Sequence, residues 1–159
     1  MRMVVCGDTH GHIAGIKAEI EKLDGLDYLI HTGDYYRDGI LLAESLGVEV
    51  RAVAGNCDIG VKGPREEVFS WAGHRFLLTH GHLYRVKNHL ISLRLRAQEV
   101  AAAVVVFGHT HQVCCEKVND ILFINPGSVS YPRLHQQGTY VVLEVNEQGI
   151  QGRIHRVRL

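Results

Sequence analysis

Residues 3–12 of the 159-residue chain read MVVCGDTHGH, an apolar run that ends in glycine, aspartate and histidine. The apolar part predicts a short buried strand. Because side chains i and i+2 of an extended chain point the same way, Asp8 and His10 are expected to project together from the end of that strand. Gly7 and Gly11 permit sharp turns on either side. A carboxylate and an imidazole aimed at one point are suited to binding a metal, although the same pattern is also typical of a turn with a helix cap.

Four further predicted strands end in the same kinds of side chain. The strands over residues 28–31, 48–53, 75–79 and 103–107 are followed by Asp34, Asn56, His80 and the pair His109 and His111, respectively. In an α/β sheet the carboxyl ends of the strands are where ligands bind, so these side chains are expected to converge. Each has a local alternative: a helix cap for Asp34, a turn for Asn56, and a surface hydrogen bond for either histidine. Their joint occurrence favours one site.

The spacing of apolar residues predicts the remaining elements. A helix from Ile13 to near Gly25 and a second over 39–46 alternate with the first three strands, which predicts a parallel sheet with right-handed crossovers. A hairpin over 67–71 and 75–79 follows, and then a longer helix with Val86, Leu90, Leu93, Ala97 and Val100 on one face. Antiparallel strands are expected over 113–118, 121–125, 139–145 and 150–157. We expect residues 1–159 to form a single domain.

Charge and composition exclude several partners. The formal net charge is +0, with 17 basic and 17 acidic residues interspersed, so no basic surface for long nucleic acid or an anionic membrane is expected. No run of about 18 apolar residues predicts a membrane span, and we expect a cytoplasmic protein. The four cysteines, Cys6, Cys57, Cys114 and Cys115, show no C-x-x-C spacing and are interpreted as free thiols. Eleven histidines are many for this length and favour imidazole or metal chemistry.

Taken in order, these motifs resemble those of the calcineurin-like metallophosphoesterase superfamily, and within it the small bacterial and archaeal phosphodiesterases of the YfcE type. The resemblance spans residues 1–132 and rests on Asp8-Thr9-His10, Gly33-Asp34, Gly55-Asn56-Cys57-Asp58, Thr79-His80-Gly81-His82, Gly108-His109-Thr110-His111 and Asn125-Pro126-Gly127-Ser128. It implies an α/β fold, a four-layer α/β/β/α sandwich of two mixed sheets. That fold agrees with a parallel first half and an antiparallel second half.

The resemblance also implies two metal ions. One would be bound by Asp8, His10, Asp34 and His111, and the other by Asp34, Asn56, His80 and His109, with Asp34 bridging. Oxygen and nitrogen ligands without thiolate favour Mn²⁺, with Ni²⁺, Fe²⁺, Co²⁺ and catalytic Zn²⁺ as alternatives. Two ions about 3.5–4 Å apart can hold a phosphate and acidify a bridging water, whose hydroxide attacks phosphorus.

Three further side chains are candidates for roles beside Asp34 and Asn56. Many family members have histidine at the position of Cys57, near the leaving group, so a thiol there indicates substrates with good leaving groups; alternatively, Cys57 packs beneath its loop. Asp58 is expected to order the Asn56 loop through hydrogen bonds. His82, like His12, is a candidate to contact phosphate or orient the ligands, with helix capping as the alternative. No motif includes the remaining histidines, which we interpret as surface or structural: His31, His74, His89, His135 and His155.

The leading hypothesis is a dinuclear metal-dependent phosphoesterase that hydrolyses small phosphodiesters. A phosphomonoesterase or a cyclic-nucleotide phosphodiesterase of the same family is the alternative enzyme. The alternative of another class is a scaffold, because one family member with an altered metal site works as a binding surface. Here all seven ligand positions are intact, which favours the enzyme. The alternating apolar strands over 139–145 and 150–157 offer an edge for a homo-oligomer.

Overall fold

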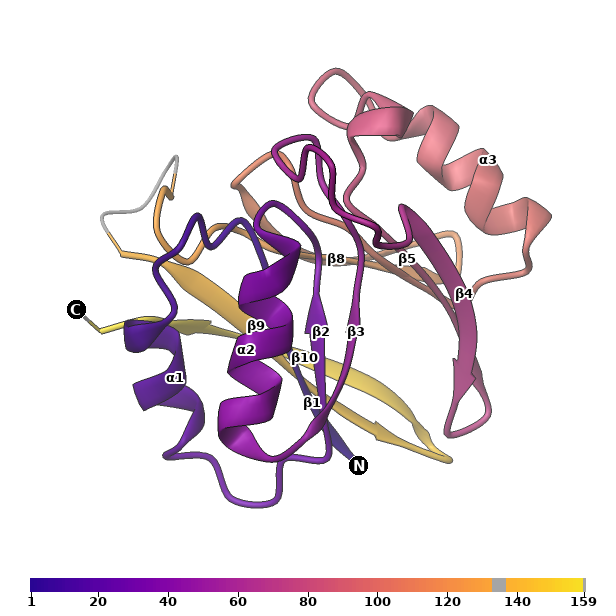
Figure 1. Ribbon diagram of the computed structural model, residues 1–159. Coiled ribbons are helices and arrows are strands. Elements are labelled where there is room, and N and C mark those ends of the chain that lie inside the picture. Colours follow the sequence, from indigo (N-terminus) through magenta and orange to yellow (C-terminus); the bar gives the residue numbers. More distant parts are fainter. Residues whose placement is uncertain (133–136, 159) are drawn as a thin grey trace.

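Two five-stranded sheets pack face to face, with helices on both outer sides (Figure 1). The computed structural model describes residues 1–132 and 137–158, so the prediction for His135 lies outside the described residues. The helices are α1 (Ala14–Ile20), α2 (Tyr36–Leu46) and α3 (Ile91–Glu99), with a short 3₁₀ turn at His82–Tyr84. No helix in these ranges is long and apolar enough to cross a membrane.

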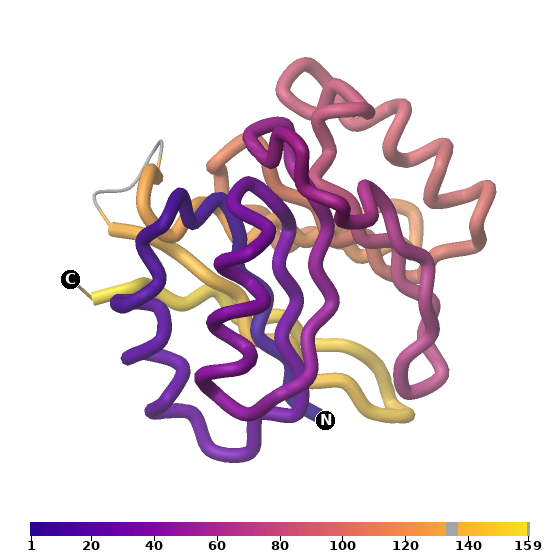
Figure 2. Tube along the Cα trace, viewed as in Figure 1, coloured from indigo at the N-terminus to yellow at the C-terminus, as the bar shows by residue number. Residues whose placement is uncertain are grey.

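The first sheet contains the N-terminal strands and both C-terminal strands. Its order is β10 (Gly149–Arg156), β9 (Thr139–Asn146), β1 (Arg2–Cys6), β2 (Tyr28–His31) and β3 (Glu49–Ala52). β1, β2 and β3 are parallel, whereas β9 runs antiparallel to β1 and to β10. Figure 2 shows this return of the chain, with the yellow C-terminal strands crossing behind the indigo N-terminal segment. Because β9 pairs with β1, the sheet is mixed.

The second sheet is built from the middle of the chain. Its order is β4 (Glu66–Trp71), β5 (His74–Thr79), β6 (Val104–Val106), β8 (Ile121–Pro126) and β7 (Val113–Val118). The β4–β5 and β7–β8 hairpins are antiparallel, but β6 lies parallel to both of its neighbours. The antiparallel pairs expected from the strands over 113–118 and 121–125 and over 139–145 and 150–157 are confirmed. β6 adds parallel pairings to the second half, so both sheets are mixed, as the family resemblance implied.

Alternation along the strands produces the layers. Met3 and Val5 of β1 point between the sheets, where they join Phe76 of β5 in the largest core cluster. Val4 of the same strand points the other way, toward α1 and α2. A third cluster joins the outer face of the second sheet to Leu93 of α3. Since successive side chains of a strand alternate between faces, strands that are buried on both sides read as continuous apolar runs. The predicted α/β/β/α sandwich is confirmed.

The longer helix predicted through residues 86–100 is wrong. The chain instead makes the 3₁₀ turn, then a series of turns, and α3 begins only at Ile91. Residues 86–90 thus lie outside any helix, and only the second part of the predicted helix forms. Val86 is nevertheless 5% exposed and packs in the same cluster as Leu93 and Ala97. The apolar spacing therefore arose from burial in a common core rather than from one helix.

Helix α2 begins three residues before the predicted start at Gly39. Within the helix, Gly39 packs against the buried ring of His31, and a Cβ on Gly39 would lie 2.6 Å from the His31 Cβ. The residue that precedes the helix is Tyr35, with a left-handed φ of 70°, and no side chain caps the N-terminus. The alternative that Asp34 caps this helix is therefore wrong.

Candidate metal centre

Loops at the carboxyl ends of five strands bring the predicted ligands to one edge of the sandwich. The loop after β1 contains Asp8 and His10, the loop after β2 contains Asp34, and the loop after β3 contains Asn56. The loop after β5 contains His80, and the loop after β6 contains His109 and His111. The strands belong to two different sheets, yet the edge is shared because the sheets pack face to face. Polar side chains from both sheets can therefore meet there.

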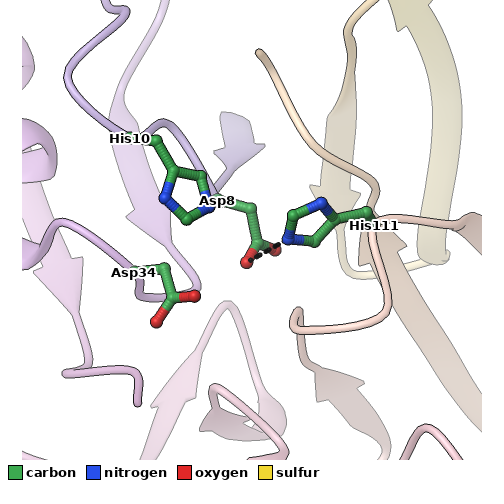
Figure 3. Close-up of side chains that lie close together, drawn as sticks. All are labelled: Asp8, His10, Asp34 and His111. Carbon is green, nitrogen blue, oxygen red and sulfur yellow. Dashed lines mark ion pairs between the residues drawn. The ribbon is translucent and has the colours of Figure 1, made fainter. Parts of the chain in front are cut away.

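The first predicted ligand set forms a compact cluster. Asp8, His10, Asp34 and His111 each offer one ligand atom, and these atoms all lie within 4.8 Å of one another. Figure 3 shows the two carboxylates and two imidazole rings around a common space. Asp8 is 0% exposed and Asp34 is 3% exposed. Two carboxylates that close together in a buried position require a compensating positive charge.

Unpartnered atoms in this cluster fit a metal-binding site. Asp8 Oδ1 and His10 Nε2 are buried and have no hydrogen-bond partner among the described residues. His111 Nδ1 lies 2.9 Å from the carbonyl oxygen of Tyr131, which can only accept a hydrogen bond. In the neutral ring Nε2 then carries no proton and has a free lone pair. Nε2 lies 3.3 Å from Asp8 Oδ1. Such atoms are suited to binding a divalent cation.

His80 repeats this arrangement in the second predicted ligand set. Its Nδ1–H donates to the carbonyl oxygen of Thr32 at 2.8 Å, so Nε2 of the neutral ring carries no proton and has a free lone pair. Nε2 lies 3.1 Å from Asn56 Oδ1 and 3.4 Å from Asp34 Oδ1. The His109 ring centroid is 5.0 Å from that of His80. His80 thus lies beside each of the other three side chains of the second set, and one of them, Asp34, belongs to both sets.

The backbone at these positions is strained. Five predicted ligands have φ between 47° and 70°, in the left-handed region that residues other than glycine seldom adopt: Asp8, His10, Asp34, His109 and His111. Strain of this kind persists only where surrounding contacts over-determine it, and it gathers at functional sites. Five of the seven predicted ligands are held in this way, which supports a site maintained for function.

A glycine contact sets the separation of two ligand loops. Gly33, which precedes Asp34, has a φ of 99°, and a Cβ there would lie 2.9 Å from both Gly55 N and His80 Nδ1. A Cβ on Gly55 would lie 2.1 Å from Asp34 Oδ1. The absence of side chains at both positions therefore lets the Asp34 loop approach the other loops closely.

The loop after β3 is ordered by Asp58. Its carboxylate accepts hydrogen bonds from Gly55 N at 2.8 Å and from Tyr36 N at 2.7 Å, and Asp58 is 6% exposed. These are hydrogen bonds of the kind that the sequence predicted for Asp58. They tie the Asn56 loop to the first turn of α2, beside Asp34.

Cys57 is exposed, so the alternative that it packs beneath its loop is wrong. Its backbone N–H donates to Asp34 Oδ1 at 2.9 Å. Partial burial and the nearby carboxylates, Asp34 first, raise the pKa of the Cys57 thiol to about 11. The side chain is therefore a neutral thiol at neutral pH. In that form it can donate a weak hydrogen bond.

His82 lies close to the second ligand set, whereas His12 does not. The His82 ring centroid is 5.3 Å from that of His80 and 6.1 Å from that of His109. Its Nε2 is 3.4 Å from Arg65 Nη1, and its Nδ1 is buried without a partner in the described ranges. His12 is exposed and contacts Tyr131.

Shifted pKa values keep two of the predicted ligands, Asp34 and His109, in the protonation state that binds metal. Burial alone would raise the pKa of Asp34, but the adjacent His80 and the Cys57 N–H lower it below its usual value. Burial, His80 and Lys87 lower the pKa of His109 to about 4, so the ring is neutral at pH 7. The Asp8 carboxylate raises the pKa of His111. Metal binding needs a deprotonated carboxylate and a neutral imidazole, and Asp34 and His109 meet that need.

A buried hydrogen-bond network beneath the centre was missed by the sequence reasoning. Thr9 Oγ1 contacts His31 Nε2 at 3.2 Å and donates to Asp38 Oδ2 at 2.7 Å. His31, interpreted as surface or structural, is structural and 0% exposed. A histidine at the end of an otherwise apolar strand was the only signal that could have indicated it.

Comparisons with known proteins identify the family. A model of the calcineurin-like phosphoesterase superfamily domain matches residues 1–148. Probable metallophosphoesterase YsnB of Bacillus subtilis strain 168 is 30% identical over 157 residues, which cover 98% of this chain and 90% of that protein. Phosphodiesterase YfcE of Escherichia coli strain K12 is 29% identical in an alignment 169 residues long, which covers 91% of this chain and 88% of that protein.

Solved structures show the same fold. A conserved protein of Streptococcus pneumoniae TIGR4, described as a predicted phosphoesterase, superposes with a TM-score of 0.81 and 27% identity, covering 98% of this chain and 88% of that chain. Vps29 of Entamoeba histolytica, in complex with Zn²⁺, superposes with a TM-score of 0.79 and 20% identity, covering 99% and 100%. The predicted metallophosphoesterase fold and the resemblance to YfcE-type proteins are thus confirmed. The chain belongs to the calcineurin-like phosphoesterase superfamily.

Proposed function

We propose that this protein is a metal-dependent phosphodiesterase with two divalent cations, Mn²⁺ first and Ni²⁺, Fe²⁺, Co²⁺ or Zn²⁺ as alternatives. The observation that supports two ions best is the matched orientation of His80 and His111. Each ring donates Nδ1–H to a backbone carbonyl and turns Nε2 toward a carboxylate, Asp34 for His80 and Asp8 for His111. A backbone carbonyl on the far nitrogen is the usual way in which proteins orient a metal-binding histidine.

The proposed ligand sets are those that the family resemblance implies. One ion would be bound by Asp8, His10, Asp34 and His111, and the other by Asp34, Asn56, His80 and His109. When bound, the ions would polarise the phosphate oxygens and lower the pKa of a water, so that hydroxide is available at neutral pH. Mixed oxygen and nitrogen donors are consistent with the proposed metals.

The protein side chains would position the substrate. Hydrolysis forms a bond from a water oxygen to phosphorus and breaks the bond from phosphorus to the leaving oxygen, which takes up a proton. His82, with Nδ1 unpartnered in the described structure, would donate to a phosphate oxygen. Asp58 would hold the Asn56 loop in place, and Cys57 would face the leaving oxygen as a neutral thiol. No protein nucleophile is needed.

The remaining proposals concern the setting of the enzyme. We propose that residues 1–159 act as one domain in the cytoplasm on a small phosphodiester, without long nucleic acid or membrane as partner. Charge balance is consistent with this, since the formal net charge is +0. β10 is the edge strand of its sheet, with Ile154 50% exposed, and would be the contact in a homo-oligomer.

The test begins with metal-stripped protein and measures hydrolysis of bis(4-nitrophenyl) phosphate and of 4-nitrophenyl phosphate before and after addition of Mn²⁺. We expect Mn²⁺ to restore hydrolysis of the diester and to bind at two equivalents by elemental analysis. Asp34→Asn should lower diester hydrolysis by more than about 100-fold, because it removes charge from the carboxylate shared by both ions. Asp120→Asn, in an exposed turn, is the matched control and should behave as wild type.

Other outcomes would replace the proposal. Faster hydrolysis of the monoester would favour the phosphomonoesterase alternative, and hydrolysis restricted to cyclic nucleotides would favour the cyclic-nucleotide phosphodiesterase. Two bound ions without turnover of any ester would favour the scaffold. Binding of one equivalent would contradict the dinuclear centre.

A further inference from the structure

A pocket outside the ligand cluster lies beside Cys57. It has a volume of about 330 Å³ and is formed where the first turn of α2 meets the loop after β3. The residues that determine its character are Tyr35, Arg37, Cys57, Asp58 and Ile59. A pocket at this place can hold the part of a substrate that extends away from the phosphate.

Two contacts connect this pocket to the candidate metal centre. Cys57 N–H donates to Asp34 Oδ1, so the pocket wall directly contacts the carboxylate shared by the two ligand sets. On the other side, the Tyr35 ring centroid is 5.2 Å from that of His10. A diester with its phosphate at the metal centre would therefore place one of its two alcohols in the pocket.

Arg37 supplies the positive charge of the pocket. Its side chain is exposed, and no described residue forms an ion pair with it. The one acid in the pocket wall, Asp58, is 6% exposed and uses both carboxylate oxygens on backbone N–H groups. The guanidinium is therefore available to an anion from outside the protein.

The backbone of Arg37 is held in register with the metal centre. The residue before it, Tyr36, donates its N–H to Asp58 at 2.7 Å. The residue after it, Asp38, accepts hydrogen bonds from Thr9 Oγ1 at 2.7 Å and from Gly11 N at 2.8 Å. Arg37 thus lies between two residues that are bonded to the loops carrying the predicted ligands. These bonds fix the backbone of Arg37 relative to the predicted ligands.

Beside this charge the pocket offers apolar surface. Ile59 is 92% exposed, an unusual state for so large an apolar side chain, and Tyr35 is 45% exposed. A free guanidinium next to a flat ring and an aliphatic side chain suits a group that is both apolar and anionic.

We propose that this pocket, the Arg37 pocket, binds the leaving alcohol of the diester, and that Arg37 pairs with a second anionic group on that alcohol. The preferred substrate is thus a small phosphodiester whose leaving group carries an additional carboxylate or phosphate next to an apolar or aromatic part. This inference rests on the proposed phosphodiesterase function and adds the class of its substrate.

The experiment compares two diesters of methanol and a nitrophenol, one with a carboxylate on the phenol ring and the other with a carboxamide at the same place. The ratio of their kcat/KM values is measured in wild type, Arg37→Ala, Arg37→Lys and Arg37→Glu, so that intrinsic leaving-group reactivity cancels between proteins. We expect Arg37→Ala to lower the carboxylate-to-carboxamide ratio by about fivefold to tenfold, the range of a partly exposed ion pair with arginine. Arg37→Lys should keep part of the preference, and Arg37→Glu should lower the ratio further. Arg75→Ala, at an exposed position on β5, is the matched control.

A second readout does not depend on turnover. Non-hydrolysable phosphonate analogues of the two diesters are bound by metal-loaded protein in a calorimeter, and the ratio of their Kd values should change across the variants in the same direction. An unchanged ratio in both Arg37→Ala and Arg37→Glu would overturn the Arg37 pocket while leaving the phosphodiesterase in place. Absence of turnover in wild type would overturn the proposed function instead, and the calorimetric ratio would still report on Arg37.

Discussion

Thr9 donates a hydrogen bond to Asp38 Oδ2 at 2.7 Å, and both side chains are buried, at 0% and 8% exposed. The same carboxylate oxygen accepts a hydrogen bond from Gly11 N. Thr9 lies between the predicted ligands Asp8 and His10, so this contact fixes their loop to helix α2. The position of two predicted metal ligands thus depends on a helix that contributes no ligand itself.

Replacing Asp38 should destabilise the fold. Asp38→Ala removes the acceptor of the Gly11 N–H and leaves the Thr9 hydroxyl with only the more distant Asp34 carbonyl oxygen, at 3.5 Å, as an acceptor. We expect a loss of about 2–4 kcal/mol in the free energy of unfolding. Asp38→Asn keeps one acceptor oxygen and should lose about 1 kcal/mol. Urea unfolding of metal-free protein measures both changes. Glu44→Ala, at an exposed position on the same helix, is the control, and an Asp38→Ala protein as stable as this control would contradict the argument.

His31 should make stability depend on pH. Its Nδ1 accepts a hydrogen bond from Gly33 N at 3.3 Å, and because Thr9 donates to Asp38, Nε2–H of His31 is the donor to Thr9. Burial is the main reason that the pKa of His31 falls to about 4, because neighbouring carboxylates offset only part of the penalty on the charged ring. Protonation of Nδ1 would break the bond to Gly33.

The sign of this dependence follows from proton binding. Between pH 6.5 and 4 the unfolded chain binds the proton and the folded protein does not, so stability is full above pH 6.5 and is lost as pH falls toward 4. We expect a contribution of about 2 kcal/mol between pH 7.5 and pH 5. Urea unfolding of metal-free wild type and His31→Gln at both pH values isolates it, since other groups titrate in both proteins. His89→Gln, at an exposed position, is the control and should keep the wild-type pH dependence. The same pH dependence in His31→Gln as in wild type would show that His31 is not the group responsible.

Gly55→Ala should weaken metal binding without a general loss of fold. The new Cβ would lie 2.1 Å from Asp34 Oδ1 and 2.5 Å from Asp34 N, so the carboxylate shared by the two ligand sets must move. We expect metal affinity to fall by about 10–100-fold. Lys62→Ala, at an exposed position of the same loop, is the control. Metal titration followed by calorimetry measures both, and equal affinities would show that Asp34 tolerates the displacement.

The strands could be predicted, and so could the gathering of the candidate ligands at one edge, because the signals for both are local. Buried strands read as apolar runs, and the polar residue after each run marks the sheet edge where ligands bind. The pairing of β9 with β1, by contrast, joins Val142 to Val4 across most of the chain, and no local pattern reports such a partner. The antiparallel hairpins were predicted correctly because their strands are neighbours in the sequence, whereas the parallel pairing of β6 with β5 and β8 was not predicted.

The support of the site could be predicted less well than its ligands. Asp58 was found because it follows Asn56 within a motif, whereas Asp38 lies on a helix where an acid is usually a solvated residue. Its burial depends on Thr9 being brought against α2 by the packing of the first sheet. Hydrogen bonds between distant segments therefore emerged only from the three-dimensional structure.

Cys57→His should change which leaving groups the enzyme accepts. Cys57 is exposed beside Asp34, and because the pKa of its thiol is raised to about 11, the thiol is a poor proton donor at neutral pH. An imidazole can give a proton to the leaving oxygen, an effect that typically contributes 10²–10⁴-fold where protonation is needed. We therefore expect Cys57→His to raise hydrolysis of alkyl esters by about tenfold or more and to leave 4-nitrophenyl esters nearly unchanged. The measurement is the slope of log kcat against leaving-group pKa, which should become shallower, with metal content checked at two equivalents and Cys57→Ser as the control of similar size. An identical slope in Cys57→His and wild type, with both ions bound, would show that this position does not face the leaving oxygen.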